Sequence, residues 1–233
     1  MAKKDYYIIE KNLNRIMRGD PTNFLDPLTY KKIVSKLSKT NYSVYYPYED
    51  SEKVIIYTKS PPNLSVLEIV SNEPLTHRSI LGSLYGLGLD GSLFGDVIIT
   101  DSNYYLIVIS SITDLIKNEL TKIGNNNVTI KDSDISILTD YHHSYQEIEI
   151  IVSSLRIDNI VASLIATSRE NVKKEFLSDN VTLNYEICHK VNYILKPNDI
   201  FSIRRYGKYK FDNIIKETKK GNFLVRIYKY TEK

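Results

Sequence analysis

The sequence predicts an α+β protein built from three consecutive modules. Apolar residues recur with helical spacing in some segments and alternate with polar residues in others, and the two patterns are interleaved along the 233 residues. The pair Pro61-Pro62 is the best linker signal. The net charge changes sign along the chain, from −3 over residues 1–148 to +6 over residues 149–233. We therefore expect a helical and hairpin module at 1–62, a mixed strand and helix module at 63–146, and a basic module at 147–233.

Composition places the chain among ordinary globular proteins. It is 42% hydrophobic and 25% charged, and 26.9 kDa is enough for two or three small domains. No apolar run approaches the roughly 18 residues of a membrane span, and the charged start Met1-Ala-Lys-Lys-Asp5 does not resemble a signal peptide. The single cysteine, Cys188, excludes an internal disulfide framework. We expect a cytoplasmic protein with no membrane partner.

The first module begins with two short helices. An apolar stripe predicts the first helix, which ends at Gly19. The stripe consists of Ile9, Leu13, Ile16 and Met17. Asp26 is an N-cap residue and Pro27 suits the first helical position, so a second helix is expected to run to Leu37. Alternating residues then predict two strands, at 42–48 and 54–58.

The middle module shows an informative order of elements. Strand, helix, strand, strand, helix and strand are expected in turn, which is the order of ferredoxin-like and RRM domains. The first five lie at Ser65–Val70, His77–Tyr85, Asp96–Thr100, Tyr104–Ile109 and Ile112–Ile123. Residues 101–103 form the tight turn between the two central strands, and Thr76 and Gly86 bound the first helix. The last strand lies at either Val128–Ile130 or Ile135–Leu138.

This middle sheet is not expected to read single-stranded RNA in the usual way. Tyr104 and Tyr105 begin its third strand, but the glycines and the basic residue of an RNA-reading RRM are missing. A structural or ribosome-docking role is therefore favoured. His77 and Arg78 open a helix, whose N-terminus favours anions. They are either a second RNA contact or the start of a capped and packed helix.

The third module contains two short helices followed by strands. Ile157, Ile160, Val161 and Leu164 form one apolar helix stripe. A second helix is expected from Ser168 to Leu177, with Thr167 and Glu170 at capping-box spacing, and Arg169 and Lys173 share its outer face. Strands are expected at Asn180–Asn184 and Asp199–Arg205. No acid, base or nucleophile is arranged for chemistry, so the module reads as a binding module.

Four segments of this module resemble the S4 RNA-binding domain. They are Leu155-Arg-Ile-Asp158, Ser168-Arg169, Val181-Thr-Leu-Asn184 and Lys196-Pro-Asn-Asp199. Two glycines of the S4 pattern are replaced here, by Asp179 and Asn198. Both are expected in turns, because Asn and Asp tolerate left-handed backbone angles better than other non-glycine residues.

Further segments are similar to the YlmH family of bacterial S4 proteins. They are Thr76–Gly82, Gly86-Leu-Gly88, Phe94–Val97, Ser202–Tyr209 and Lys219-Lys-Gly221. In the last-but-one segment, Arg205 replaces a glycine and Lys208 an arginine of the family. The resemblance implies binding to the large ribosomal subunit by 23S rRNA and the P-site peptidyl-tRNA, in rescue of stalled nascent chains. Because the family's genes neighbour cell-division genes, it also implies a division-linked role.

The candidate RNA-binding residues are mostly basic and lie in the third module. Between Lys196 and Lys229 the chain has 10 basic and 3 acidic side chains, which favours an anionic partner. The aromatic residues Tyr206 and Tyr209 are interleaved with this charge, as suits RNA backbone and exposed bases. The candidates are Arg156, Asp158, Asn159, Ser168, Arg169, Lys173, Lys174, Asn184, Arg204, Arg205, Tyr206, Lys208, Tyr209, Lys210, Lys219 and Lys220, with His77 and Arg78 as a second contact.

Two other functions are alternatives to RNA binding alone. An RNA-modifying enzyme could use an S4 domain as its targeting arm, but residues 1–146 show neither an aspartate-centred nor a methyl-donor signature. A protein-interaction module would need exposed apolar sheet faces. His142-His143 lacks further ligands at metal spacing, and Cys188 and His189 point to opposite faces of a strand. We expect a monomeric, non-catalytic protein that binds structured RNA, with no metal, cofactor or small-molecule substrate.

Overall fold

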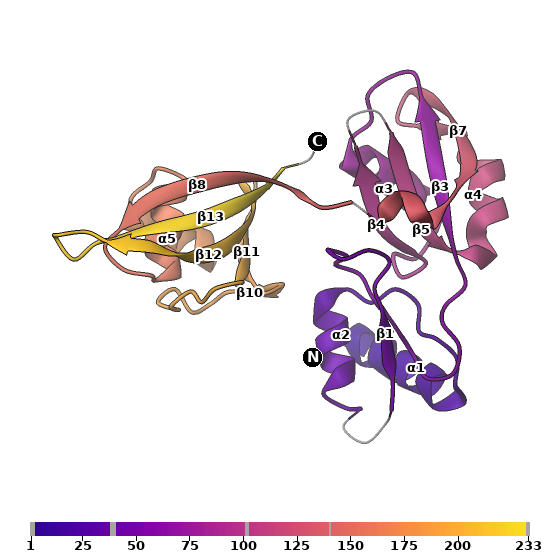
Figure 1. Cartoon of the computed structure of the whole chain (residues 1–233), viewed down its shortest axis with the longest axis horizontal. Helices are drawn as coiled ribbons and strands as arrows, with labels where there is room; N and C mark the ends of the chain where they lie inside the picture. The colour runs from indigo at the N-terminus through magenta and orange to yellow at the C-terminus, as the bar shows by residue number, and fades with distance from the viewer. Residues whose placement is uncertain (1–2, 38–40, 101–102, 140, 232–233) are drawn as a thin grey trace. The chain divides into compact units, whose positions relative to one another are not determined.

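The computed structural model describes residues 3–37, 41–100, 103–139 and 141–231, and it is a mixed α+β structure (Figure 1). The chain forms two compact units, one ending at His142 and the other running from His143 to Thr231. The proline pair at 61–62 lies inside the first unit and does not separate the two units. None of the described helices combines the length and apolar character needed to cross a membrane.

The first unit contains two helices, a hairpin and then a larger sheet with its own helices. The helices are α1 (Lys3–Arg18), α2 (Pro27–Val34), α3 (His77–Gly86) and α4 (Thr113–Glu119), with short 3-10 helices η1 (Ser110–Ile112) and η2 (Ile135–Leu138). The strands are β1 (Ser43–Tyr45), β2 (Ile55–Tyr57), β3 (Leu64–Ser71), β4 (Phe94–Ile99), β5 (Tyr104–Ile109), β6 (Lys122–Ile123) and β7 (Asn126–Ser133).

Local signals explain the N-terminal elements. The Asp26 carboxylate accepts a hydrogen bond from the backbone N–H of Thr29 at 2.9 Å, which confirms the predicted cap of α2. Gly19 ends α1 with a φ of +87°, a conformation that favours glycine. Strands β1 and β2 pair antiparallel as expected. Two details were wrong: Met17 is 73% exposed, and α2 ends at Val34 because the following residues form a tighter turn.

The larger sheet has the strand order β4-β5-β3-β7-β6. The observed β7 agrees with the first of the two positions expected for the last strand, whereas Ile135–Leu138 is a 3-10 helix. The helix expected over residues 112–123 is shorter, since the chain leaves it at Leu120 and turns at Gly124 (φ +60°) into the β6–β7 hairpin. Residues 101–102 of the expected tight turn lie outside the described residues.

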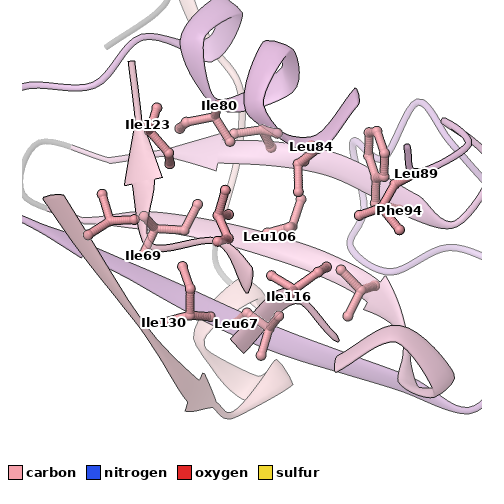
Figure 2. Packing of buried hydrophobic residues seen from close by; sticks show 14 of the residues in the cluster. Leu67, Ile69, Ile80, Leu84, Leu89, Phe94, Leu106, Ile116, Ile123 and Ile130 are labelled. Atoms are coloured by element: carbon pink, nitrogen blue, oxygen red, sulfur yellow. The ribbon is translucent and has the colours of Figure 1, made fainter. Parts of the chain in front are cut away.

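One face of this sheet packs against α3 and α4. Leu67, Ile69 and Leu106 of the strands and Ile80 and Leu84 of α3, labelled in Figure 2, belong to one buried cluster. All five side chains are 1% exposed or less. This apolar layer explains why the alternating strand pattern was readable in the sequence.

The opposite face is covered by the N-terminal module. Phe24, Tyr48 and Ile55 belong to one buried cluster with sheet residues that point away from the helices. Those sheet residues are Val66, Ile98 and Ile107. Consequently this face of the sheet is not an exposed apolar surface. A protein-interaction module was expected to need such a surface, and these positions do not provide it.

Polar contacts strengthen the same junction. The Asp96 carboxylate accepts hydrogen bonds from Tyr48 Oη at 2.9 Å and from the N–H of Glu52 at 3.0 Å. The ammonium of Lys53 donates to the carbonyls of Gly91 and Phe94, both at 2.8 Å. Burial raises the pKa of Tyr48 and lowers the pKa of Lys53. These contacts tie the β1–β2 hairpin to the larger sheet.

The second unit is a sheet with two helices on one face. Its strand order is β10-β9-β11-β12-β13-β8. The elements are β8 (Ser144–Val152), α5 (Ile157–Leu164), α6 (Arg169–Leu177), β9 (Val181–Leu183), β10 (Glu186–Ile187), β11 (Ile200–Ile203), β12 (Gly207–Glu217) and β13 (Phe223–Thr231). Helices and strands share a core that includes Ile157, Ile160, Val161, Val172, Phe176, Phe201, Ile203 and Phe211.

Strands β8 and β13 were missed in the sequence. They pair antiparallel from Ser144↔Thr231 to Val152↔Phe223, and Figure 1 shows them side by side. The alternation of Ile148, Ile150 and Val152 was the available signal. The pairing places the expected module boundary after residue 146 in the middle of β8, so a cut there would divide a strand.

Candidate nucleic-acid interface

The N-terminus of α5 holds an arginine on a buried carboxylate. Arg156 is the N-cap residue, and its guanidinium bonds Asp158 twice, Nε to Oδ1 at 3.0 Å and Nη2 to Oδ2 at 2.6 Å. The side chain of Asp158 is 5% exposed and that of Arg156 is 41% exposed. The hydrogen bonds that Arg156 donates to Asp158 raise the pKa of Arg156. The buried carboxylate of Asp158 thus holds the guanidinium of Arg156 in position at the surface.

A second arginine is held by the neighbouring residue. Arg169 Nη2 donates to Asn159 Oδ1 at 2.9 Å and to Ser153 Oγ at 3.1 Å. Asn159 is buried, and its Nδ2 donates to the carbonyl of Ser154 at 3.0 Å. Asp158 and Asn159 were expected to touch RNA, but their burial makes them positioning residues for the two arginines. Sequence reasoning missed Ser153, for which no local pattern gave a signal.

Helix α6 presents the lysines expected on its outer face. Lys173 and Lys174 are exposed, whereas Val172 and Phe176 face the core. Ser168 is the N-cap and accepts from the N–H of Asn171 at 3.3 Å, so the cap lies one residue later than the predicted Thr167. The hydroxyl of Ser168 therefore caps the helix start, and the residue is exposed.

Arg204 and Arg205 lie in a turn rather than in the expected strand. Strand β11 ends at Ile203, and Arg205 adopts a φ of +73° in the turn before β12. This left-handed backbone is a conformation glycine adopts readily, and Arg205 aligns with a glycine of the family segment. The N–H of Arg204 donates to the carbonyl of Asn180 at 2.8 Å, and Arg205 lies 3.7 Å from the Glu175 carboxylate of α6. Both arginines are exposed.

The two predicted stacking tyrosines differ in burial. Tyr206 is 43% exposed, whereas Tyr209 is 3% exposed and stacks on Phe201 with ring centroids 5.4 Å apart. Tyr209 is therefore a core residue and offers no face to a base, which corrects the expectation. Lys208 lies over the rings of Tyr185 and Tyr230, with its ammonium 4.9 and 4.6 Å from their centroids. Lys210 is half-buried on the same strand.

Left-handed turns occur where the two glycines of the S4 pattern are replaced. Asp179 has a φ of +55° and Asn198 a φ of +71°, which confirms the predicted turn conformations. Asn184, also left-handed, donates to Asp199 Oδ1 at 2.8 Å and accepts from the N–H of Ile200 at 3.0 Å. Its amide thus stabilises the turn, while the residue itself is exposed.

The remaining candidates lie apart from this group in the chain. Lys219 and Lys220 are exposed in the turn between β12 and β13. His77 and Arg78 open α3 in the first unit, where Thr76 and Ser79 form a capping box with both hydrogen bonds at 3.1 Å. The box supports the reading of a capped helix start, while the exposed Arg78 stays available at the surface.

His142, His189 and Cys188 each lie beside a polar group. His142 Nδ1 lies 3.2 Å from Asp50, and His189 lies 3.8 Å from Asp179. Cys188 is buried, which raises the pKa of its thiol, and its Sγ bonds the carbonyl of Lys190. Within the described ranges, no group of three or more His, Cys, Asp or Glu side chains could hold a metal ion.

The first unit has a cleft of about 410 Å³ between α1, α2 and the loop before β4. Several of its charged side chains serve the fold: Asp26 caps α2, Arg15 donates to the carbonyl of Pro21, and Lys53 donates to backbone carbonyls. Asp90 accepts from the N–H of Ser92 at 2.9 Å. The geometry thus gives these groups structural tasks.

Comparisons with known proteins agree with the resemblance read from the sequence. A family model described as "Putative RNA-binding domain in YlmH" matches residues 64–136. The chain is also 32% identical over 152 residues to the "Ribosome-associated protein quality control protein P2" of Bacillus subtilis (strain 168). Residues 64–136 of the chain therefore resemble the putative RNA-binding domain of the YlmH family. The alignment covers 64% of this chain and 58% of the length of that relative.

A solved structure, "Cell division protein ylmH from Streptococcus pneumoniae", is also similar. It matches with a TM-score of 0.49 and 20% identity, over 60% of this chain and 97% of that one. The matched family model, from β3 to η2, lies wholly in the first unit. The arginine and lysine candidates of α5, α6 and the β11–β12 turn lie outside it.

Proposed function

We propose that this chain, which resembles the YlmH family, binds structured RNA and does not catalyse a reaction on it. One observation carries the proposal: exposed cations of the second unit are held in place by buried or half-buried polar groups. Arg156 rests on Asp158, Arg169 on Asn159, and the turn containing Arg204 is tied to Asn180. Preorganised guanidinium groups lose little freedom on binding phosphate, and their forked donors match its oxygens.

In more detail, we propose that the second unit is an S4 domain and that the middle of the first unit is RRM-like. The four S4-like segments support the former. The latter is supported by the order β3, α3, β4, β5, α4, β7 and by the strand neighbours β4-β5-β3-β7. Tyr104 and Tyr105 at the start of β5 bond Leu75 and Asn103, which favours a structural role for them.

We further propose the ribosome as the site of action. The Bacillus subtilis relative is named a ribosome-associated protein quality control protein. By the family resemblance, the partners would be rRNA and P-site tRNA on the large subunit during rescue of stalled nascent chains. The protein would act there as a monomer in the cytoplasm.

The family description adds a competing location for RNA contact. It assigns putative RNA binding to residues 64–136, where the sheet face opposite the helices is covered by Phe24, Tyr48 and Ile55. An RNA contact there would have to use other surfaces, such as the start of α3 with Arg78. An RNA-modifying enzyme and a cell-division-linked interaction module are the alternatives.

Sucrose-gradient sedimentation of the tagged full chain in a bacterial lysate tests the proposal. The protein should travel with large subunits, and more strongly with those that still hold tRNA. The Arg204→Ala/Arg205→Ala variant should shift toward the top of the gradient, since it loses two exposed cations but no buried contact. Sedimentation solely with small subunits, or free protein under all conditions, would contradict the ribosomal proposal.

A further inference from the structure

The face of the second sheet that points away from α5 and α6 carries a group of tyrosines. Side chains alternate across a strand, and Tyr209, Phe211 and Ile227 point into the helix-covered core. Their neighbours in sequence therefore point to the other side. The group, called here the tyrosine face, consists of Tyr145 of β8, Tyr228 and Tyr230 of β13, and Tyr185 after β9.

Strand register brings these side chains together. Tyr145 is paired with Tyr230, and their ring centroids lie 4.9 Å apart at 70°. Tyr145 also meets Tyr228, with centroids 5.7 Å apart at 50°. These are tilted and edge-to-face contacts, which hold each ring in one orientation. The rings come from strands that adjoin in space, and β8 and β13 are 70 residues or more apart along the chain.

Cations accompany the rings. The ammonium of Lys208 covers the faces of Tyr185 and Tyr230, and Lys210 is the register partner of Tyr228. The nearby carboxylates of Glu147 and Glu149 are paired with Arg226, at 2.9 and 3.4 Å. Lys208 and Lys210 thus supply positive charge beside Tyr230 and Tyr228. Tyr145 is 38% exposed on the same face.

We propose that the tyrosine face binds a short single-stranded RNA segment, with unpaired bases against Tyr145 and Tyr228 and phosphates beside Lys208 and Lys210. Aromatic side chains interleaved with cations are the usual platform for unpaired bases. A protein partner fits less well, because the cores of protein interfaces are depleted in Lys and Glu, which border these rings. This proposal rests on the RNA-binding function and adds the state of the RNA it prefers.

The test compares two RNAs with the full chain. One is a labelled oligouridine of about ten nucleotides, and the other is a blunt hairpin whose loop is as short as possible. The Tyr145→Leu/Tyr228→Leu variant should bind the oligouridine about tenfold or more weakly, since stacking on each ring is lost. Its affinity for the hairpin should change by less than about twofold, because paired bases are not free to stack.

Two controls separate lost rings from lost structure. Tyr145→Phe/Tyr228→Phe keeps both rings and should retain oligouridine affinity, while Tyr85→Leu removes an exposed tyrosine of the first unit and should change neither affinity. If the leucine variant is less well folded by thermal melting, ultraviolet crosslinking of 4-thiouridine to the wild-type chain decides. Crosslinked peptides should then fall within residues 144–152 or 223–231.

The outcomes are distinguishable. Unchanged oligouridine affinity in a folded leucine variant, equal losses for both RNAs, or crosslinks confined to other segments would overturn the tyrosine face. Wild-type binding to the hairpin but not to the oligouridine would overturn it too, while leaving structured-RNA binding intact. If the wild-type chain binds neither RNA, the proposed function itself fails.

Discussion

Replacing Arg204 and Arg205 with alanine should weaken RNA binding without unfolding the protein. The N–H of Arg204, not its side chain, donates to Asn180, so the alanine variant keeps this bond. The Arg205 side chain is 71% exposed and pairs with Glu175 at 3.7 Å. Exposed ion pairs of this kind contribute less than ~1 kcal/mol. Alanine also leaves the left-handed backbone at 205 as demanding as before, since both residues carry a Cβ.

The effect on binding follows from counterion release. Each phosphate contact adds a slope of roughly −0.7 to −0.9 in log affinity against log salt. Two lost contacts should flatten the slope by up to about two and lower the affinity by roughly thirtyfold near 0.15 M salt. The loss should be similar for unrelated structured RNAs, because phosphates carry no sequence information.

Fluorescence anisotropy titrations between about 50 and 200 mM salt measure the slope. Over this salt range, six phosphate contacts would lower the RNA affinity about a thousandfold. A matched control is Lys122→Ala/Lys131→Ala, which removes two exposed charges from β6 and β7 of the first unit. If the control flattens the slope and the arginine variant does not, the RNA contact belongs to the middle module. An unfolded arginine variant, or one that loses a single RNA sequence at an unchanged slope, would refute the phosphate account.

Three further outcomes are expected. A fragment starting at His143 should keep most of the RNA affinity, and residues 1–142 should bind RNA weakly. Equal RNA affinity of the two fragments would contradict this expectation. A fragment starting at residue 147 should be less stable than the one starting at His143, because it loses part of β8. Tyr48→Phe removes the bond to Asp96 and should lower the unfolding free energy by about 2 kcal/mol in urea titrations, since bonds to charged groups contribute about that much. Cys188 should react slowly with iodoacetamide at pH 8 until denaturant is added, because the thiol is buried and its pKa is raised. Rapid alkylation of the folded chain would contradict the position of Cys188 in the core.

Several elements were readable because their causes are local. Asp26 and Pro27 start α2 through a cap and a preset backbone angle, which depend only on neighbours in the chain. The alternation in β3 and β5 was visible because one sheet face packs on helices. The turn conformations of Asp179 and Asn198 follow from the backbone tolerance of their side chains. Sequence motifs also predicted the resemblance to the YlmH family, and a family model matches residues 64–136.

Other features depend on contacts between distant segments. Strands β8 and β13 form because residues 144–152 pair with residues 223–231. The local sequence of neither segment predicts which segment it pairs with. Tyr209 looked like a surface aromatic among lysines, but the register of β12 turns it onto Phe201 in the core. Asp158 and Asn159 looked like RNA contacts until burial showed that they hold arginines. Strand register and helix packing decide which side of each residue meets water, and only the tertiary structure contains that information.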